Sequence, residues 1–554
     1  MIVRKEKTSF YRLLEILPGT LTWATFIAAV SFSYWAPSYV ALYIIVFDLY
    51  WVLKAINTAI HLMNSFFKLR QHATYDWRGR LDLLTDLSGY KNYLRREIVA
   101  ATRRNKKRDL KTELKRLDNV GFYGRNLDFR KVYHLLILPT YQESLEVLEN
   151  SIVSFIESDF PKDQIFFILA IEERDEQQAR ANAEILRERY ADKFLRFVVI
   201  MHPDGTPGEM AAKGANLTYA GRKALVMIQD MGIPVENVLV SAFDCDTVVA
   251  RNYFSYLTYA FLTAEEPYLT SYQPMPVYNN NIWDAPAITR IIAVANSFWQ
   301  MVEASRPDRL VTFSSHAMTL KALVDVDFWP VDIVSEDSQI FWRCWLFYNG
   351  RYRVKPLFTN VSLDAMLDAT YLKTLIGQYK QKRRWAWGNS ENLPYLITEA
   401  LPNKQIPAWK KFIYIERMFE GYYFWATASI MIAALGWLPL LLGGNRFDNG
   451  VLVYNLPLLT QGMMQIATLF LIFSVYINLV LLPPRPAKYS RWRSVAMILQ
   501  WVFVPVVSTV FGSAPAIDSQ TRAMFKRYLG FWVTPKTRKS TAIDPAMIFQ
   551  KRNV

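Results

Sequence analysis

Long, apolar segments constrain this chain more than any other feature of its sequence. The clearest one is the uncharged run from Leu17 to Trp35, which follows an amino end carrying Arg4, Lys5, Lys7 and Arg12. A run of this length is sufficient to cross a bilayer. Its extent, and the lack of a small-x-small cleavage site after it, favour a membrane anchor over a secretory leader. We therefore expect a membrane protein that also carries a soluble domain.

Further apolar segments are candidate spans. Tyr39–Ile60 contains Asp48 and Lys54, which we expect to face protein or an interface, and its alternative is an amphipathic surface helix. Three more lie in the C-terminal third, at 421–442, 459–482 and 494–511. Because Pro505 and Pro515 interrupt the longer segment Ser494–Ile517, we expect it to enter and return, or to split into two short pieces.

The distribution of basic residues predicts the orientation of these spans. The link Pro483–Arg493 and the tail 521–554 are rich in Lys and Arg, whereas Gly443–Gly450 contains only Arg446. Positive residues gather on the cytoplasmic side, so we expect the link and the tail to be cytosolic in a multi-pass protein of the plasma (inner) membrane. The net charge of +15 fits such loops. No zinc-finger spacing or aromatic-basic RNP signature supports a nucleic-acid partner.

Cysteine and histidine usage adds two expectations. Only Cys245 and Cys344 are present, which is too few for a disulfide framework and suits a reducing, cytosolic face. The five histidines show no metal-ligand spacing, and we interpret them as structural.

The middle of the chain alternates apolar runs with helical patterns, as βαβ units do. Four runs are predicted to be parallel strands, at 132–138, 164–171, 194–201 and 237–243. Helical spacing lies between them, from Leu145 to Ile156, at Arg174–Tyr190 and at Ala211–Met231. The pattern predicts a doubly wound, Rossmann-like and mostly parallel α/β domain. It contains neither a P-loop nor a dinucleotide-binding glycine motif, so any phosphate charge must be met in another way.

Two carboxylates, Asp244 and Asp246, directly follow the fourth predicted strand. In an open α/β sheet this edge is where ligands bind. Two hard oxygen donors at this edge suit Mg²⁺ or Mn²⁺ carrying a diphosphate. An Asp-x-Asp triplet alone is common in turns, and its context decides its meaning.

Two more groups of polar residues lie on predicted helices. Glu336 and Asp337 follow Ser335, a plausible N-cap, and the helix dipole predicts that both are ionised and able to accept a proton; the alternative is simple helix capping. Further on, Gln381, Arg384 and Trp385 share one helical face, a combination that suits a phosphate and a sugar ring. A basic-aromatic helix on the membrane surface is a compatible interpretation.

Taken in order, these motifs resemble those of membrane-embedded family 2 glycosyltransferases, a group that includes cellulose, hyaluronan and chitin synthases. The resemblance covers roughly residues 130–390. It rests on Pro139-Thr-Tyr-Gln-Glu143, Lys213-Gly-Ala-Asn216, Asp244-Cys-Asp246, Glu336-Asp337 and Gln381-Lys-Arg-Arg-Trp385. Phe531–Lys536 looks like the cytosolic end of the family. Gln-x-x-Arg-Trp is the most specific motif, because it marks the processive branch.

The resemblance implies a GT-A-like cytosolic domain and a role for each matching residue. Thr140, Tyr141 and Glu143 would line the nucleoside pocket, and Lys213 would face the diphosphate. Asp246 would bind Mg²⁺ or Mn²⁺, and Asp244 would contact the ribose or the metal shell. In the catalytic pair Glu336–Asp337, Asp337 would be the general base. Gln381 and Arg384 would hold the diphosphate and a gating loop, and Trp385 would be the acceptor platform.

This chain also departs from the family pattern. Glu172-Glu173-Arg174 replaces the usual Asp-Asp-Gly, so either one of these Glu residues reads the base or the donor differs from UDP. Gln142 replaces Asn, and Ser335 replaces Thr. The acceptor-side loop Phe313–Ala317 lacks the Gly-rich form of the family, which leaves the acceptor open.

These observations predict the domains and the function together. We expect two N-terminal spans (1–62), a basic helical linker (63–130), the glycosyltransferase domain (131–370), interfacial helices (371–418), C-terminal spans (419–520) and a basic tail (521–554). The expected activity is inverting, metal-dependent transfer from a nucleotide-sugar, such as a UDP-sugar, to a growing glycan that crosses the bilayer through the protein. The alternatives are single transfer to a polyprenyl phosphate or other lipid, and a nucleotide-sensing transporter or channel that uses Asp48 and Lys54.

Overall fold

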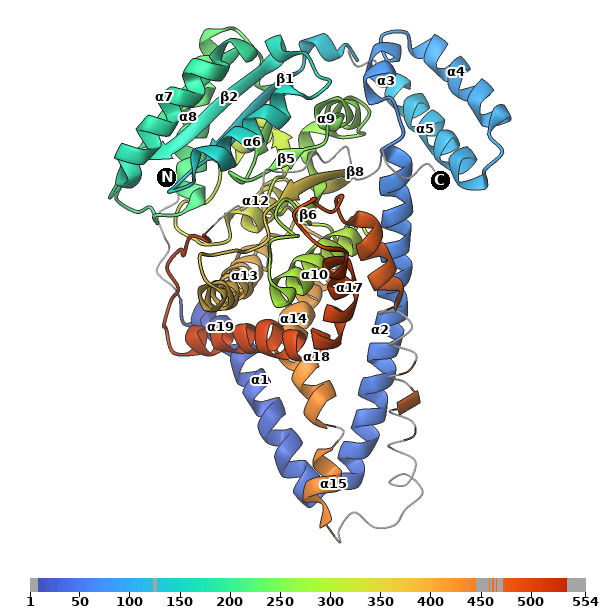
Figure 1. Cartoon of the computed structure of the whole chain (residues 1–554), viewed down its shortest axis with the longest axis vertical. Helices are drawn as coiled ribbons and strands as arrows, with labels where there is room; N and C mark the ends of the chain where they lie inside the picture. Colours follow the sequence, from blue (N-terminus) through green and yellow to red (C-terminus); the bar gives the residue numbers. More distant parts are fainter. Residues whose placement is uncertain are drawn as a thin grey trace.

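The computed structural model describes residues 8–122, 127–435, 437–444, 458, 461–462, 465 and 472–535. The molecule tapers from a wide α/β end to a narrow end built from apolar helices (Figure 1). The two ends match the two classes of segment that the sequence contains.

An eight-stranded sheet forms the wide end, in the order β3-β2-β1-β4-β7-β6-β8-β5. Its first half comprises β1 (Tyr133–Pro139), β2 (Ile165–Glu172), β3 (Arg196–His202) and β4 (Val238–Ala242), all parallel. These are the four predicted strands, so the Rossmann-like half is confirmed. Their runs are nearly continuous in apolar residues because helices cover both faces of the sheet.

The second half of the sheet is mixed and was not predicted. It comprises β5 (Val248–Val249), β6 (Thr270–Tyr278), β7 (Ala317–Thr319) and β8 (Arg353–Leu363). β7 is antiparallel to β4 and β6, whereas β6 and β8 are parallel, with a register shift between Gln273 and Met275. Prolines at 274 and 276 lie within β6, and proline ordinarily argues against a central strand.

Two helical layers cover the sheet. The cluster on one face packs α6 (Leu145–Ile156), α7 (Glu176–Tyr190) and α9 (Tyr253–Leu262) against alternate residues of β1, including Leu136 and Leu138. The opposite face packs α8 (Lys213–Asp230), α11 (Leu320–Asp325) and α12 (Glu336–Phe347) against Leu135 and Ile137. Successive side chains of β1 point to opposite faces of the sheet, so they contribute alternately to the two hydrophobic cores.

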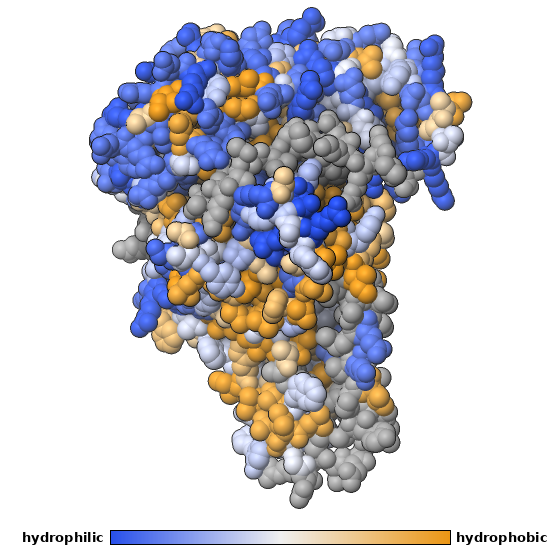
Figure 2. Space-filling model, viewed as in Figure 1, coloured by the Kyte–Doolittle hydropathy of each residue, from blue (hydrophilic) through white to orange (hydrophobic). Residues whose placement is uncertain are grey.

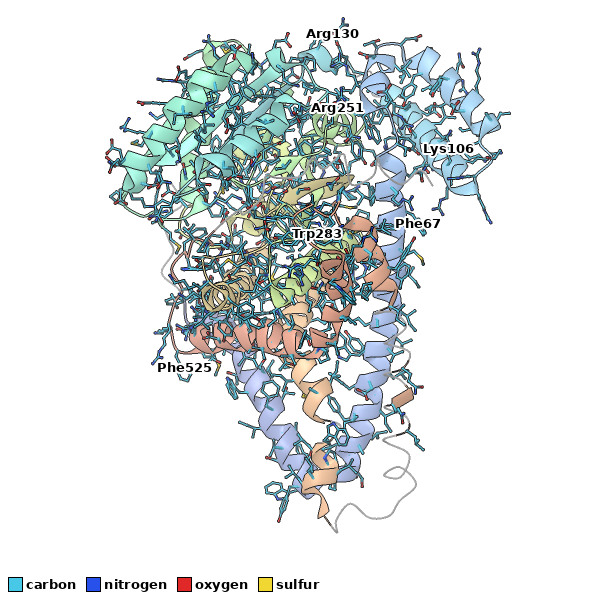
Figure 3. The ribbon with its side chains drawn as sticks, viewed as in Figure 1. Phe67, Lys106, Arg130, Arg251, Trp283 and Phe525 are labelled. Carbon is cyan, nitrogen blue, oxygen red and sulfur yellow. The ribbon has the colours of Figure 1, made fainter. Side chains whose placement is uncertain are left out.

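The basic linker folds as a helical unit on the α/β domain, made of α3 (Trp77–Leu83), α4 (Leu87–Ala100) and α5 (Arg104–Phe122). Trp77 stacks on Tyr256 of α9 with ring centroids 3.9 Å apart. Glu113 is buried and accepts hydrogen bonds from Arg80 and from the hydroxyls of Tyr90 and Tyr259. Lys106, labelled in Figure 3, lies on this unit, on the side of the molecule away from α15. The unit therefore belongs to the wide end.

Apolar helices build the narrow end. They include α1 (Ser9–Trp35), α2 (Pro37–His72), α14 (Ala408–Ile430) and α15 (Leu438–Leu442), with a π-helical turn at Met431–Leu435. In the described residues, three helical segments are long and apolar enough to cross a membrane: Ser9–Trp35, Pro37–His72 and Arg491–Met524. The lower surface in Figure 2 is correspondingly hydrophobic. In this region Nζ of Lys54 on α2 lies 2.6 Å from Oε1 of Glu420 on α14 and forms an ion pair with it.

The segment 491–524 is bent. It passes through α17 (Arg491–Leu499), a 3-10 turn (Gln500–Phe503), α18 (Val504–Val507), a π-helical turn (Ser508–Ser513) and α19 (Ala514–Met524). The break falls beside Pro505, in agreement with the expected split. In Figure 1, α19 runs across the upper end of α1. The predicted span 459–482 lies mostly outside the described residues, although Ile472–Leu481 is helical.

Two connecting helices join the ends of the molecule. α10 (Ala287–Ala304) packs Met301 and Val302 against α2, and α13 (Tyr371–Ala400) runs between the α/β domain and α19. Trp283, labelled in Figure 3, precedes α10 and donates its indole N–H to the carbonyl of Pro483 at 3.1 Å. The link Pro483–Arg493 therefore contacts the α/β domain directly.

Candidate active site

Lys213, the first residue of α8, joins the two acidic motifs of the sequence. Its Nζ lies 2.6 Å from Oδ1 of Asp244, which follows β4, and 3.2 Å from Oδ1 of Asp337, in the first turn of α12. Burial alone would lower the pKa of Lys213, but Asp244, Asp337 and Glu336 together raise it above its ordinary value. The lysine therefore stays protonated, and the two motifs form one site.

Gly214 explains why a glycine follows this lysine. A Cβ at position 214 would lie 2.4 Å from the carbonyl oxygen of Pro330 and 3.0 Å from Cβ of Glu336. The absence of a side chain lets α8 begin against the loop that leads into α12. That close approach brings Lys213 within reach of Asp337.

Glu336 differs from its sequence-based expectation. Its side chain is 3% exposed, and burial, followed by the charge of Asp337, raises its pKa to about 8. Glu336 is therefore mostly protonated at neutral pH, whereas we expected both carboxylates to be ionised. The helix dipole contributes only about 0.3–1 kcal/mol, which is less than the cost of burying a charge. Asp337, with its side chain 25% exposed, is the more accessible acid.

His316 lies at this site although its sequence context gave no sign of it. Its Nδ1 is 2.8 Å from the carbonyl of Phe313 and 3.9 Å from Asp337, and its Nε2 accepts a hydrogen bond from Trp329. These partners fix a neutral ring with the proton on Nδ1. Burial lowers the pKa of His316, which favours the same form. A lone histidine has no spacing that could have revealed this position.

Asp246 is held in a second, more buried group. One carboxylate oxygen accepts the backbone N–H of Asp364 at 2.8 Å, and Asn280 donates to the Asp246 carbonyl and to the Asp364 carboxylate, each at 2.9 Å. Sequence reasoning missed Asp364 and Asn280. Asp364 directly follows β8, so it carries the same signal as Asp244, an acid at the end of an apolar strand.

The carboxylate oxygens of Asp244 and Asp246 are suitable ligands for a divalent cation that is bound to the diphosphate of a substrate. Among the residues that the structure describes, no group of three or more His, Cys, Asp and Glu side chains has the arrangement of a metal site. Mg²⁺ ordinarily takes one or two carboxylates and completes its shell with phosphate and water. Two carboxylates, Asp244 and Asp246, are therefore sufficient.

Glu143 braces the loop after β1. It accepts hydrogen bonds from the Thr140 hydroxyl at 2.8 Å and from the Tyr141 backbone, and Sγ of Cys245 lies 3.0 Å from its other oxygen. The predicted nucleoside-pocket residues thus come together, with Glu143 tying their loop to the Asp-Cys-Asp motif. The Glu143–Cys245 contact places the motif after β1 next to the Asp-Cys-Asp motif after β4.

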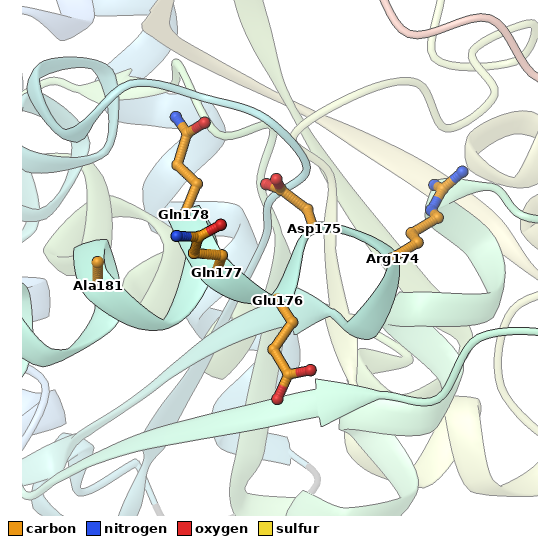
Figure 4. Close-up of a pocket in the computed structure, with 6 residues that line it drawn as sticks. All are labelled: Arg174, Asp175, Glu176, Gln177, Gln178 and Ala181. Atoms are coloured by element: carbon orange, nitrogen blue, oxygen red, sulfur yellow. The ribbon is translucent and has the colours of Figure 1, made fainter.

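Glu172, Glu173 and Arg174, which stand where the family has Asp-Asp-Gly, line a pocket at the ends of β2 and β3. Arg174 lies over the Tyr141 ring at 3.9 Å and pairs with Glu172. The pocket, of about 100 Å³, is lined by Glu172, Glu173, Arg174, His202, Pro203, Asp204, Gly205, Thr206, Glu209, Met210 and Ala211. A more open depression lies at the start of α7, where the side chains point in different directions (Figure 4). Of these two hollows, the smaller and more enclosed one is the better candidate site for the nucleobase of a nucleotide.

The Gln-x-x-Arg-Trp segment lies on α13, beside the acidic site. Gly388 of this helix packs against Ser335, where a Cβ would lie 2.9 Å from the serine Cβ. The Arg384 guanidinium lies 4.8 Å from the Phe531 ring, and its Nε is buried without a hydrogen-bond partner in the described part of the chain. The Trp385 ring lies 6.3 Å from that of Tyr278, at the end of β6. Gln381 accepts a hydrogen bond from Gln378.

Glu391, one turn further along α13, is a positioning residue that sequence reasoning missed. Its carboxylate accepts hydrogen bonds from the backbone N–H of Val334 at 3.2 Å, the Ser335 hydroxyl at 2.7 Å and the Trp387 indole at 3.1 Å. These bonds hold the turn that presents Glu336 and Asp337. Nothing in its sequence context distinguishes Glu391 from a surface acid.

Comparison with known proteins gives the class. Residues 239–508 match the family model described as glycosyl transferase family group 2, and no curated protein matches the chain. The matched segment is just under half of the chain, and it makes the chain similar to the family 2 glycosyltransferases. The match confirms the predicted enzyme class, glycosyltransferase, and the α/β domain is GT-A-like, which confirms the predicted fold class.

Three of the solved structures that are similar to the chain are the following. A mannosyltransferase from Pyrobaculum calidifontis, solved with GDP-Man and Mn²⁺, is 16% identical, covers 68% of this chain and 86% of its own, and has a TM-score of 0.36. S. aureus TarS 1–349 with UDP-GlcNAc is 16% identical, covers 64% and 93%, and scores 0.34. GalNAc-T7 with UDP, GalNAc and Mn²⁺ is 10% identical, covers 53% and 58%, and scores 0.31.

Proposed function

We propose that this protein is an inverting, metal-dependent polysaccharide synthase that takes its nucleotide-sugar from the cytosol. The observation that carries the proposal is the contact of one lysine with both acidic motifs: Lys213 lies within 3.2 Å of Asp244 and of Asp337. Residues suited to the donor diphosphate and a residue suited to deprotonating an acceptor therefore share one site. The proposed localisation is the plasma (inner) membrane.

The donor occupies the edge formed by β1, β2 and β4. Its base enters the pocket beside Glu172 and Glu173, and its diphosphate lies over Asp244 and Lys213. A bound Mg²⁺ or Mn²⁺, held by Asp246 and Asp244, supplies Lewis-acid stabilisation of the leaving diphosphate. Lys213 and Arg384 add positive charge on the protein side. The Nε of Arg384 has no hydrogen-bond partner among the described residues, which supports that role.

Asp337 accepts the proton of the acceptor hydroxyl as that oxygen attacks the anomeric carbon. The bond from that carbon to the diphosphate oxygen breaks in the same step, so the anomeric centre inverts. Glu336, mostly protonated at neutral pH, leaves the base role to its neighbour. The Asp337 backbone carbonyl accepts a hydrogen bond from the Thr312 hydroxyl at 2.6 Å, which helps to hold the first turn of α12 in place.

The position of α13 favours polymer synthesis with transfer across the bilayer. Trp385 lies on the helix that joins the α/β domain to the apolar helices, and Arg383 of the same helix pairs with Asp518 of α19 at 2.8 Å. A product leaving the Trp385 platform would thus pass next to the membrane-spanning segments. Lys54 pairs with Glu420, an arrangement that gives the transporter alternative no support.

The test is release of nucleoside diphosphate by the purified protein in detergent. UDP- and GDP-sugars are screened with Mg²⁺ or Mn²⁺, and the product is sized on a gel with and without a polyprenyl phosphate. The proposal expects metal-dependent release and a long product without added carrier. A single-sugar lipid product would instead establish the non-processive alternative, and no release with any donor would refute the enzymatic proposal.

A further inference from the structure

A part-buried lysine lies beside the expected acceptor platform with no acidic partner. Nζ of Lys382, on α13, is 5.1 Å from the ring centroid of Trp385 and 5.1 Å from that of Trp425. Its hydrogen-bond partner is Oδ1 of Asn296 on α10, at 3.2 Å. No ion pair of Lys382 with a carboxylate is found within the described ranges. Three helices therefore enclose one ammonium group.

The surroundings of Lys382 are unfavourable for a charge without a counter-ion. Burial lowers its pKa to about 8. Two indole faces and one amide oxygen offset only part of the lost hydration, because a cation–π contact is weaker than an ion pair with a carboxylate. A lysine used only for packing could be replaced by an apolar residue at this position, whereas an anion that binds here would gain a desolvated, charge-assisted partner.

Lys382 lies near the residue that we expect to bind the acceptor. The Trp385 ring lies 6.3 Å from that of Tyr278, the last residue of β6. Trp425 belongs to α14, which continues toward the narrow end through the π-helical turn and α15 (Figure 1). Lys382 lies between the rings of Trp385 and Trp425. It therefore lies where the expected acceptor platform, Trp385, meets an apolar helix, α14.

We propose that Lys382, Trp385, Trp425 and Asn296 form an acceptor subsite for a group that carries negative charge, a phosphate or a carboxylate, next to the sugar that is extended. This inference rests on the proposed function and deepens it. The two rings flank the acceptor, Lys382 donates to its anionic oxygens, and the Asn296 amide orients the ammonium. The anion is either the phosphate of a lipid-linked acceptor or the carboxylate of an acidic glycan.

The experiment compares paired acceptors that differ only in this charge. One pair is a polyprenyl-phosphate-linked sugar and the corresponding polyprenyl glycoside without phosphate; the other is an oligosaccharide with a uronate unit and its neutral counterpart. A hydrogen bond to a charged group contributes about 1.5–3 kcal/mol, which corresponds to roughly a 10- to 150-fold preference in kcat/KM for the charged member. The responsive pair identifies the source of the anion.

Variants then assign the preference to Lys382. Lys382→Met should abolish it by raising the acceptor KM while the donor KM stays near wild type, and Lys382→Arg should retain most of it. Lys380→Met, on the same helix but over the Trp532 ring, is the matched control and should keep the preference. The inference is overturned if wild type transfers equally to both members of each pair, or if Lys382→Met keeps the preference. If wild type releases no nucleoside diphosphate with any donor, the proposed function itself has failed.

Discussion

The hydroxyl of Ser335 donates a hydrogen bond to Glu391 at 2.7 Å and so links the start of α12 to the middle of α13. The contact joins the Glu-Asp motif to the helix that carries Gln-x-x-Arg-Trp. Burial raises the pKa of Glu391 to about 7, and its three hydrogen-bond donors oppose that rise. The link therefore depends on pH near neutrality.

We predict that Glu391→Gln removes a pH dependence of stability. Because the folded pKa is raised above the unfolded value of about 4.5, Glu391 stabilises the fold below that value, and this contribution is lost as pH rises toward 7. The loss is on the order of 3 kcal/mol at most. Between pH 5 and pH 8 the Tm of Glu391→Gln should fall less than that of wild type. Glu188→Gln, on the exposed face of α7, is the control, and parallel curves for all three proteins would contradict the prediction.

Asp246→Asn and Asp337→Asn should each lower turnover by at least about 100-fold while leaving the Tm near that of wild type. The first change weakens the proposed cation site, and the second removes the proposed base. Nucleoside diphosphate release under saturating donor is the measurement. Asp327→Asn changes an exposed carboxylate that pairs with Arg222, and it should behave as wild type. Near-normal transfer by either site variant would refute the corresponding role.

Lys213→Met should destabilise the protein and make its stability depend on metal. Without the ammonium, Asp244 and Asp337 lose the positive charge that they share, which costs about 3 kcal/mol. Added Mn²⁺ can replace the missing charge, so it should raise the Tm of the variant more than that of wild type. Thermal unfolding with Mn²⁺ or with a chelator measures the difference. Equal metal-induced shifts in the variant and in wild type would show that Mn²⁺ does not bind close enough to Asp244 to replace the lost charge.

Glu113 should be essential for attachment of the α3–α5 unit. Glu113→Gln leaves Arg80 without its counter-charge in a mostly buried contact, at a cost of about 3 kcal/mol, and should expose the unit to limited proteolysis. Glu97→Gln removes a more exposed pair with Lys106 and should cost less than about 0.5 kcal/mol. Similar proteolysis of the two variants would argue against a role for Glu113 in attaching the α3–α5 unit.

Cysteine labelling should test the proposed orientation. Cys245 and Cys344 are both buried, so they should contribute little background. We expect Lys488→Cys to react only from the cytosolic side of sealed vesicles, and Trp437→Cys, 65% exposed beside α15, only from the opposite side. An impermeant maleimide added to vesicles of known orientation distinguishes the sides. Labelling of both positions from one side would contradict the topology.

Local patterns were sufficient for the parallel half of the sheet and for the acids at its edge. Apolar runs such as 237–243 form strands because both faces are buried, and the parallel direction places Asp244 at the ligand edge. Local patterns did not predict β6, because its two prolines argue against a strand. They also did not predict a role for Asp364, because its contact with Asp246 forms only when the end of β8 lies beside that residue.

The sequence by itself was sufficient to predict the long apolar helices at 9–35 and 37–72, the parallel α/β half and the positions of the acidic motifs, because these depend on hydrophobicity and periodicity within short stretches. Only the tertiary structure decided which acid stays protonated, that His316 and Glu391 belong to the site, and that Lys382 lies between two indoles. Those properties arise from burial and from charges brought together across long separations in the chain, which no local pattern encodes.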